Sequence, residues 1–299
     1  MTERLGEFAA LGTALLWTLT YIQFTIAVRK VGPAVLNRLR LLAALLFLVI
    51  AHTIVYGLPV PIEVGWAQLG WLTLSGVVGF AISDAFLFSG LLHLGAHRTS
   101  LVMSLIPVTS ACLSWAVFGE RLSTIQIVAG LITLSGILLV VSARRGETEQ
   151  RGRSSLGVGV LFALGAVLAQ SLRYILSVQG MRGGLAPLSA NVLQIAAATV
   201  TVWLAAFVGG RAKESFVGLR ERSAALPTLG GALTGPFLGV TLSMVALTRA
   251  PVGIASTLMA LSPVFLLPAS WVVFKEPITR RAVIGTLLAV AGVALLFLY

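Results

Sequence analysis

Apolar runs of about 20 residues follow one another along nearly the whole chain, and this feature restricts its fold more than any other. A helix of that length crosses the hydrocarbon of a bilayer, where lipid offers no partners for backbone N–H and C=O groups. Charged residues make up 10% of the 299 residues, against about 25% in a soluble globular chain. The sequence therefore predicts an all-α membrane protein with ten transmembrane helices, near 8–28, 34–56, 66–92, 96–118, 124–142, 155–178, 187–208, 225–248, 252–274 and 279–298.

The second half of the chain repeats the first. A polar linker at 144–155 separates the halves, and residues of the third to fifth helices recur 156 positions later, while the first two helices agree at offsets of 153 and 154. This predicts two five-helix repeats, 1–146 and 147–299. Because five is odd, the sixth helix crosses in the direction opposite to the first, so the repeats are inverted. The pairs at offset 156 are Gly79 and Gly235, Ser100 and Ser256, Met103 and Met259, Pro107 and Pro263, Trp115 and Trp271, Phe118 and Phe274, Glu120 and Glu276, and Gly136 and Gly292.

Inverted repeats predict a transport function. Two conformations related by exchanging the halves can open one central cavity to each side of the membrane in turn. We therefore expect a multi-pass, small-molecule transporter in a bacterial-type inner (cell) membrane, with a channel or a structural membrane protein as the alternative class. The chain contains no H-E-x-x-H, G-x-S-x-G or phosphate-binding Gly-rich loop, so no enzyme, cofactor or metal site is predicted.

Two ionisable residues lie at membrane depth, where such groups are costly and usually face a cavity or a partner. Asp84 lies in the third predicted helix and Arg173 in the sixth, each past the helix middle. These helices run antiparallel, so the two residues approach opposite faces, which favours separate roles in one aqueous cavity over a direct ion pair. The alternatives are snorkelling of Arg173 to the headgroups and a helix-packing hydrogen bond for Asp84.

Polar and aromatic side chains at helical spacing indicate further members of a binding surface. Residues three or four apart share a helix face, aromatic rings can stack on a substrate, and amides can pair with a zwitterion or a sugar. Interfacial anchoring, packing and interhelical hydrogen bonding are the alternatives. The candidate substrate-binding residues are Trp17, Tyr21, Asp84, Gln170, Arg173, Tyr174, Asn191 and Gln194.

Pro107 and Pro263 occupy equivalent places in the two halves, in the middle of predicted helices. Each removes a backbone donor, so the sequence predicts paired kinks, and we interpret them as gating hinges with a static kink as the alternative. Ser123 and Gln126 have the spacing of a capping box, which favours a structural role for the neighbouring Glu120.

The chain carries a formal net charge of +11, and its cations lie in short clusters between apolar runs. That pattern disfavours a nucleic-acid partner. Most Lys and Arg residues, counting Arg38, Arg40 and Arg98, fall in the odd-numbered connections between helices. Because cytoplasmic loops carry the excess of Lys and Arg, the count places both termini outside. The first apolar run is expected to be a membrane helix and not a removed signal.

The segment GFAISDAFLFSGLLHLGAHRTSLVMSLIPV, followed by FGERL, resembles the EamA family of the drug/metabolite transporter superfamily, as does the pair of five-helix repeats. The resemblance covers nearly the whole chain. It implies ten helices around a central cavity, alternating access, and export or exchange of amino acids, metabolites or drugs. It also implies cytoplasmic termini, which conflicts with the charge count and leaves the orientation open.

The substrate and the coupling ion are open at this point. A sugar-phosphate or nucleotide-sugar exchanger is the second candidate within transport, and it should present several buried Lys or Arg to phosphates. The halves differ where Asp84 aligns with Val240 and Arg98 with Ile254, so the cavity should be chemically asymmetric. One acid at depth motivates the hypothesis that Asp84 couples transport to protons, with a counter-substrate as the alternative.

Overall fold

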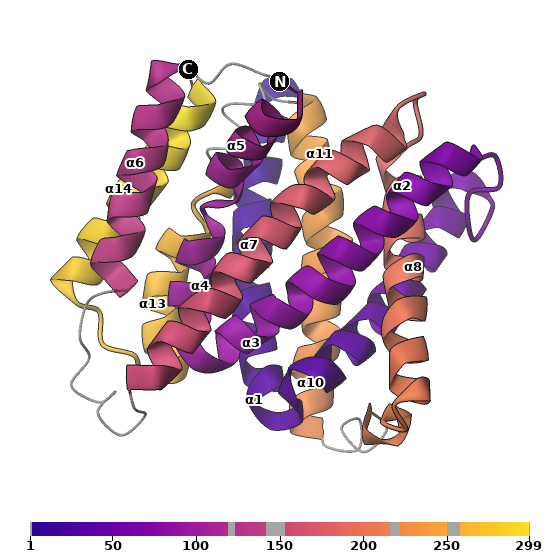
Figure 1. Cartoon of the computed structure of the whole chain (residues 1–299), viewed down its shortest axis with the longest axis horizontal. Helices are drawn as coiled ribbons and strands as arrows, with labels where there is room; N and C mark the ends of the chain where they lie inside the picture. Colours follow the sequence, from indigo (N-terminus) through magenta and orange to yellow (C-terminus); the bar gives the residue numbers. More distant parts are fainter. Residues whose placement is uncertain (1, 119–122, 142–152, 216–221, 250–257, 299) are drawn as a thin grey trace.

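A computed structural model describes residues 2–118, 123–141, 153–215, 222–249 and 258–298, which form a bundle of helices (Figure 1). The helices of the first half are α1 (Thr2–Tyr56), α2 (Trp66–Gly76), η1 (Val77–Ser83), α3 (Asp84–Leu94), α4 (Ala96–Met103), α5 (Ile106–Phe118) and α6 (Thr124–Val141). Those of the second half are α7 (Arg153–Met181), α8 (Pro187–Val208), α10 (Arg222–Ala232), η3 (Leu233–Gly239), α11 (Val240–Arg249), α13 (Ser262–Phe274) and α14 (Arg280–Leu298). The prediction of an all-α fold is confirmed.

The long α1 consists of two helices joined at a break. Gly32 has φ 77° and ψ 165°, which is not helical, and Pro33 follows it. Glycine adopts a positive φ without a steric penalty, and proline begins a helix well because the first turn does not need its N–H. The first segment of α1 ends at this break and the second segment runs on to Tyr56, as the predicted helices 8–28 and 34–56 require.

Six helices in the described part of the chain are long and apolar enough to cross a membrane. They are Leu5–Tyr56, Trp66–Leu94, Thr124–Val141, Leu156–Met181, Pro187–Val208 and Arg222–Ser243. Large apolar side chains such as Leu161 and Ile54 are exposed on their outer faces, where lipid would cover them. The chain is therefore a multi-pass membrane protein, while the count of ten spans stays a prediction.

The two halves are interlocked. The first segment of α1 packs on α10, η3 and α11, and α7 packs in the same way on α2, η1 and α3 (Figure 1). Small side chains allow this close approach: a Cβ on Gly235 would lie 2.7 Å from Cγ2 of Thr20, and the Oγ1 atoms of Thr20 and Thr234 are 2.8 Å apart. The boundary predicted at 146/147 lies outside the described residues, as does most of the polar linker.

Helices α6 and α14 form a close pair at one edge of the bundle (Figure 1). Equivalent glycines of the two halves make the contact: a Cβ on Gly136 would lie 2.5 Å from the carbonyl oxygen of Gly285, and one on Gly292 would lie 2.5 Å from the backbone nitrogen of Thr133. These helices therefore touch backbone to backbone, as small residues permit in membranes.

Irregular backbone recurs at the repeat offset. The π-helices η1 and η3 are seven residues long and begin at Val77 and Leu233, which are 156 positions apart. The sequence did not predict them, because a π-helix has no composition signal comparable to that of an apolar span.

The prolines expected to kink two helices instead begin helices. A turn at 104–105 separates α4 from α5, and a turn at 260–261 precedes α13. Pro107 and Pro263 are each the second residue of the helix that follows, where the missing N–H costs no helical hydrogen bond. The mid-helix placement was therefore wrong, although the two interruptions do occupy equivalent positions.

The predicted capping box at the start of α6 is present. The backbone N–H of Ser123 donates to Oε1 of Gln126 at 2.9 Å, and the N–H of Gln126 donates to Oγ of Ser123 at 3.2 Å. These two bonds satisfy donors that the first turn of a helix leaves free. Glu120, whose structural role was predicted from this motif, lies outside the described residues.

Candidate functional site

A buried ion pair joins the second segment of α1 to α3. The guanidinium of Arg40 donates through Nη2 to the carboxylate of Asp84, and both side chains are buried. Asp84 is the first residue of α3, directly after η1. Counting Arg40 as a loop residue was therefore wrong, because it lies within a helix and its charge is paired inside the protein.

The π-helix η1 supplies acceptors to this pair. In a π-helix the backbone bonds span five residues instead of four, so some carbonyls are displaced from the regular pattern. The Phe80 carbonyl accepts from Nη2 of Arg40 at 3.1 Å, and the Ala81 carbonyl accepts from Nδ2 of Asn37 at 3.0 Å. Oδ1 of Asn37 in turn accepts from Nε and Nη2 of Arg40, at 3.2 and 2.9 Å. Arg40 is thus fixed by three different acceptors.

Arg173 of α7 also lies beside the Phe80 ring. Its Nη1 donates to Oε1 of Gln194 at 3.1 Å. With the Gln170 amide turned so that its oxygen faces the guanidinium, that oxygen accepts from Nη2 and Nε at 2.9 and 3.1 Å. The guanidinium carbon lies 4.6 Å from the ring centre of Phe80 and 4.7 Å from that of Tyr174, both within cation–π range.

Four of the predicted site residues, Gln170, Arg173, Tyr174 and Gln194, are therefore in contact. Asp84 is linked to these four residues indirectly. Its partner Arg40 has its guanidinium carbon 5.9 Å from the centre of the Phe80 ring, which Arg173 also contacts. In the described part of the chain no ion pair joins Asp84 to Arg173 directly.

The other three predicted site residues lie on α1 and α8. Tyr21 packs against three separate groups of buried apolar residues, at the middle of the bundle. Trp17 lies against η3, where a Cβ on Gly239 would be 2.9 Å from its ring. Asn191 is buried and donates to the carbonyl of Pro236 in η3 at 3.3 Å. Trp17 and Asn191 thus contact the second π-helix, and not the Arg173 group, which consists of Gln170, Arg173, Tyr174 and Gln194.

Sequence reasoning missed Arg40 and Phe80. Arg40 is six residues inside the helix predicted at 34–56, and a buried acid requires a partner, so these two facts together could have indicated the pair. Phe80 carried no signal, because an apolar residue in an apolar run is indistinguishable from core.

Two further cations were misplaced in loops. Arg38 is buried within α1, where its Nη1 donates to the carbonyl of Arg211 at 2.9 Å and its Nη2 lies 3.5 Å from a carboxylate oxygen of Glu214. Arg98 is buried within α4. Removing Arg38, Arg40 and Arg98 from the loop count weakens the charge asymmetry without reversing it.

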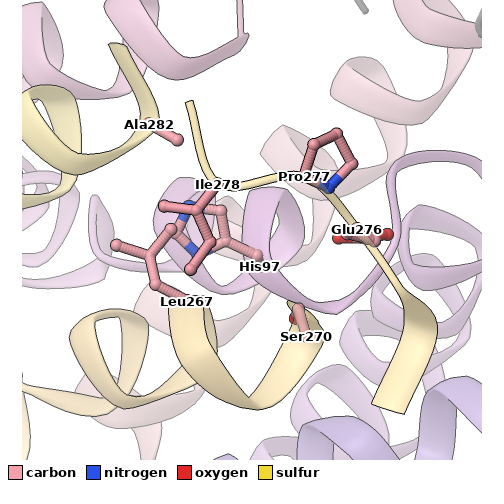
Figure 2. A pocket seen from close by; sticks show the side chains of 7 residues that line it. All are labelled: His97, Leu267, Ser270, Glu276, Pro277, Ile278 and Ala282. Atoms are coloured by element: carbon pink, nitrogen blue, oxygen red, sulfur yellow. The ribbon is translucent and has the colours of Figure 1, made fainter. Parts of the chain in front are cut away.

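A small pocket lies away from this cluster, where α4, α13 and the start of α14 meet (Figure 2). His97 of the first half and Ser270 and Glu276 of the second half line it. A carboxylate oxygen of Glu276 lies near Gly95 just before α4, at 3.2 Å from where a Cβ would be. The pocket therefore marks a contact between the halves, and none of the predicted substrate-binding residues lines it.

The described residues form an all-helical membrane protein in which equivalent irregular elements interrupt helices of both halves, a feature that many secondary transporters built from repeats share. Residues 4–142 and 157–298 each match the EamA-like transporter family, and the chain belongs to this family of membrane transporters. This confirms the resemblance inferred from the sequence.

A solved crystal structure of another protein is similar over 98% of this chain and 96% of that chain, with a TM-score of 0.64 and 20% sequence identity. At that identity the similarity concerns the fold alone. No curated protein matches the sequence.

Proposed function

We propose that this protein carries small metabolites with a carboxylate group, amino acids or close relatives of them, across a bacterial-type cell membrane by alternating access, as an exporter or exchanger. Membership of a transporter family supports the transport function.

The observation that carries the carboxylate preference is the charge of Arg173. Its hydrogen-bond partners in the described part of the chain are the two amides of Gln170 and Gln194, which are neutral. A guanidinium has five N–H donors, and the three bonds to these amides leave two for a ligand. Arginine binds carboxylates through paired N–H groups, so an unneutralised guanidinium held by amides and rings fits such a substrate.

The aromatic rings around Arg173 favour an organic substrate with an apolar part. Phe80 and Tyr174 flank the guanidinium, and the Tyr174 side chain is exposed. Trp17, Tyr21 and Asn191 are proposed to contact the remainder of the substrate.

The repeat supports the proposal of alternating access. We propose ten spans: each segment of α1, the continuous stretches from α2 to α3 and from α10 to α11, the interrupted stretches ending in α5 and α13, and α6, α7, α8 and α14. A central cavity would then open to each side as the halves exchange conformations, with the turns before Pro107 and Pro263 as hinges.

Exchange of sugar phosphates or nucleotide sugars is the second candidate. The observation in its favour is Arg40, a second guanidinium beside the same Phe80 ring, which is itself buried. Asp84 neutralises Arg40 in this structure, which leaves one unneutralised positive charge in the cluster and favours a single carboxylate over a phosphate.

The test is ligand-dependent thermal stabilisation of the purified protein, with amino acids, acetate, nucleobases, sugar phosphates and cationic drugs as the panel. A ligand that binds only the folded state raises its melting temperature in proportion to the logarithm of ligand concentration over Kd. The variant is Arg173→Gln. The matched control is Arg182→Gln, which changes an exposed arginine directly after the last residue of α7.

We expect stabilisation by one or more carboxylates in the wild type and in Arg182→Gln, and a loss of affinity of tenfold or more in Arg173→Gln. Hydrogen bonds to charged groups contribute about 1.5–3 kcal/mol, which corresponds to that factor. Stabilisation by sugar phosphates alone would select the second candidate. Carboxylate binding that is equal in all three proteins would remove Arg173 from the site. Saturable counterflow in proteoliposomes would exclude a channel.

A further inference from the structure

Gly79 of η1 leaves room for the side chain of Arg173. Gly79 is buried, and a Cβ built on it would overlap Cδ of Arg173 and lie 2.5 Å from its Cγ and 2.9 Å from its Nε. The stem of the arginine therefore passes directly over the backbone of the π-helix. Glycine is the residue that permits such a close approach to a backbone, and no larger side chain fits here while the arginine keeps its place.

The two backbones are held together on both sides of this contact. Oγ of Ser75 donates to the carbonyl of Arg173 at 3.0 Å, and Oγ of Ser83 donates to the carbonyl of Ala166 at 2.9 Å. These serines lie four residues before and four residues after Gly79. A methyl group at position 79 would therefore displace the side chain of Arg173, because the hydrogen bonds on either side keep α7 from moving away.

The atoms that would be displaced carry the guanidinium. Cδ and Nε of Arg173 connect it to the rest of the side chain, and its Nη1 donates to Oε1 of Gln194 at 3.1 Å. Its central carbon lies 4.6 Å from the centre of the Phe80 ring. Hydrogen bonds depend strongly on distance and angle, so a stem pushed away from Gly79 would take the guanidinium out of this arrangement.

The second half of the chain contains the same contact without the charge. Gly79 corresponds to Gly235 at the offset of 156, and Arg173 corresponds to Thr20 at the offset of 153. A Cβ on Gly235 would lie 2.7 Å from Cγ2 of Thr20. The glycine therefore belongs to the repeat unit, and the residue that crosses it differs between the halves. Only the first half places a cation over its glycine.

We propose that Gly79 is a positioning residue of the carboxylate site. It acts through Arg173: the absence of a side chain at 79 lets the arginine reach Gln194 and the Phe80 ring while two N–H groups remain for the substrate. A larger residue should reduce affinity more than stability, because the group that has to move is a flexible side chain and not a backbone. This role rests on the proposed function.

The experiment combines two measurements on the purified protein. Isothermal titration calorimetry gives the affinity for acetate and for the amino acids of the panel, and thermal unfolding gives the melting temperature without ligand. The proteins are the wild type, Gly79→Ala, Gly235→Ala, Arg173→Ala and the double variant Gly79→Ala/Arg173→Ala. Gly235→Ala is the matched control, because its methyl group meets the equivalent, uncharged residue. Arg173→Ala removes Cγ, Cδ and Nε, the atoms nearest to the methyl group at 79.

In Gly79→Ala we expect a loss of affinity of about tenfold or more, as for lost hydrogen bonds to a charged group, and a melting temperature lowered by at most about 4 °C. Gly235→Ala should bind like the wild type. Its melting temperature should fall at least as far, because the short, β-branched Thr20 has no flexible stem to move aside. In the Arg173→Ala background, alanine at 79 should change neither quantity, since the two residues act as a unit.

Unchanged affinity in Gly79→Ala would overturn the positioning role. Equal losses of affinity in Gly79→Ala and Gly235→Ala would also overturn it, because they would indicate a general effect on the fold. A further loss caused by alanine at 79 in the Arg173→Ala background would do the same.

If Gly79→Ala is too unstable to titrate, the double variant decides. Stability restored by Arg173→Ala would support the contact, and instability that persists would overturn it. Failure of every carboxylate probe to bind the wild type would overturn the proposed function and the positioning role with it, an outcome distinct from those that concern Gly79 alone.

Discussion

Asn37 and Asn191 perform the same task in the two halves. They align at an offset of 154, and each donates its Nδ2 to a carbonyl of the π-helix in its own half. The aligned pair three positions further on differs: Arg40 donates to Asp84, whereas its counterpart Gln194 accepts from the Arg173 guanidinium. The chemical asymmetry of the site therefore arises from single substitutions on an otherwise repeated scaffold.

Replacement of these asparagines by leucine, which has a similar volume and no polar atoms, tests the roles of the two amides. We expect Asn37→Leu to lower the free energy of unfolding by about 1–3 kcal/mol, since it leaves a buried carbonyl without its donor and Arg40 without an acceptor. Asn191→Leu removes a single longer bond of 3.3 Å and should cost less. Denaturant unfolding in detergent measures both variants, and a larger loss at Asn191 would contradict the assignment.

Among the elements, η1 and η3 are the clearest structural sign of the repeat. Both are seven-residue π-helices at the same position in their halves, although η3 contains Pro236 and η1 contains no proline. An irregularity shared by both halves belongs to the repeat unit and does not depend on Asp84, which follows only η1. Its effect is to displace carbonyls that polar residues of α1 and α8 then use.

The proposed hinges before α5 and α13 can be tested at Pro107 and Pro263. Pro107→Ala and Pro263→Ala should lower the free energy of unfolding by no more than about 1 kcal/mol, because each proline lies in the first turn of its helix and mainly restricts the unfolded chain. If the turns before them bend during transport, the double variant should bind substrate normally while its counterflow rate falls. Pro268→Ala, inside α13, is the control. An unchanged counterflow rate in the double variant would contradict the proposal that these turns act as hinges.

The close contact between α6 and α14 can be tested at Gly136. In Gly136→Ala the new methyl group would meet backbone atoms of α14, which cannot move aside as a flexible side chain could. We expect a loss of about 1–3 kcal/mol in the free energy of unfolding. In Gly70→Ala the methyl group meets nothing within 4 Å, and the better helix propensity of alanine should leave stability equal or up to about 1 kcal/mol higher. Equal losses in thermal unfolding would refute the contact.

At the scale of the whole molecule, each half covers the third helical stretch of the other. The first segment of α1 packs on the stretch from α10 to α11, and α7 packs on the stretch from α2 to α3. The Arg173 group lies in one of these two crossings, because Arg173 comes from α7 while Phe80 and Asp84 come from η1 and α3. A relative movement of the halves would therefore change the site directly.

Ten spans predict which connections share a side of the membrane. Residue 63, after two spans, should lie on the side of both termini, and residue 213, after seven, on the opposite side. In a background of Cys112→Ser, which removes the exposed cysteine, Glu63→Cys and Lys213→Cys should react with a membrane-impermeant thiol reagent from opposite sides. Reaction of both from one side would refute the ten-span topology. Labelling of residue 63 from outside would support the charge count, and labelling from the cytoplasm would support the orientation that the family resemblance implies.

The sequence by itself determined the features that depend on local composition and length. Apolar runs specify membrane helices because lipid offers no hydrogen-bond partners to backbone N–H and C=O groups, which must therefore bond within the helix. The recurring offset of 156 residues indicates a repeat from the sequence alone. Asp84 and Arg173 could be selected as candidates because each is an ion in an apolar run, and Ser123 with Gln126 formed the capping box that its spacing predicted.

Only the tertiary structure decided which partners these residues have. Arg40 and Asp84 are 44 positions apart on different helices, so their pairing depends on the rotation and depth of those helices, which a hydropathy pattern does not specify. The π-helix η1 and the turn before Pro107 are likewise decided by packing and by nonlocal hydrogen bonds. Phe80 comes close to two guanidinium groups only when α1 and α7 meet around η1, because an apolar side chain has no directional chemistry of its own to reveal its contacts beforehand.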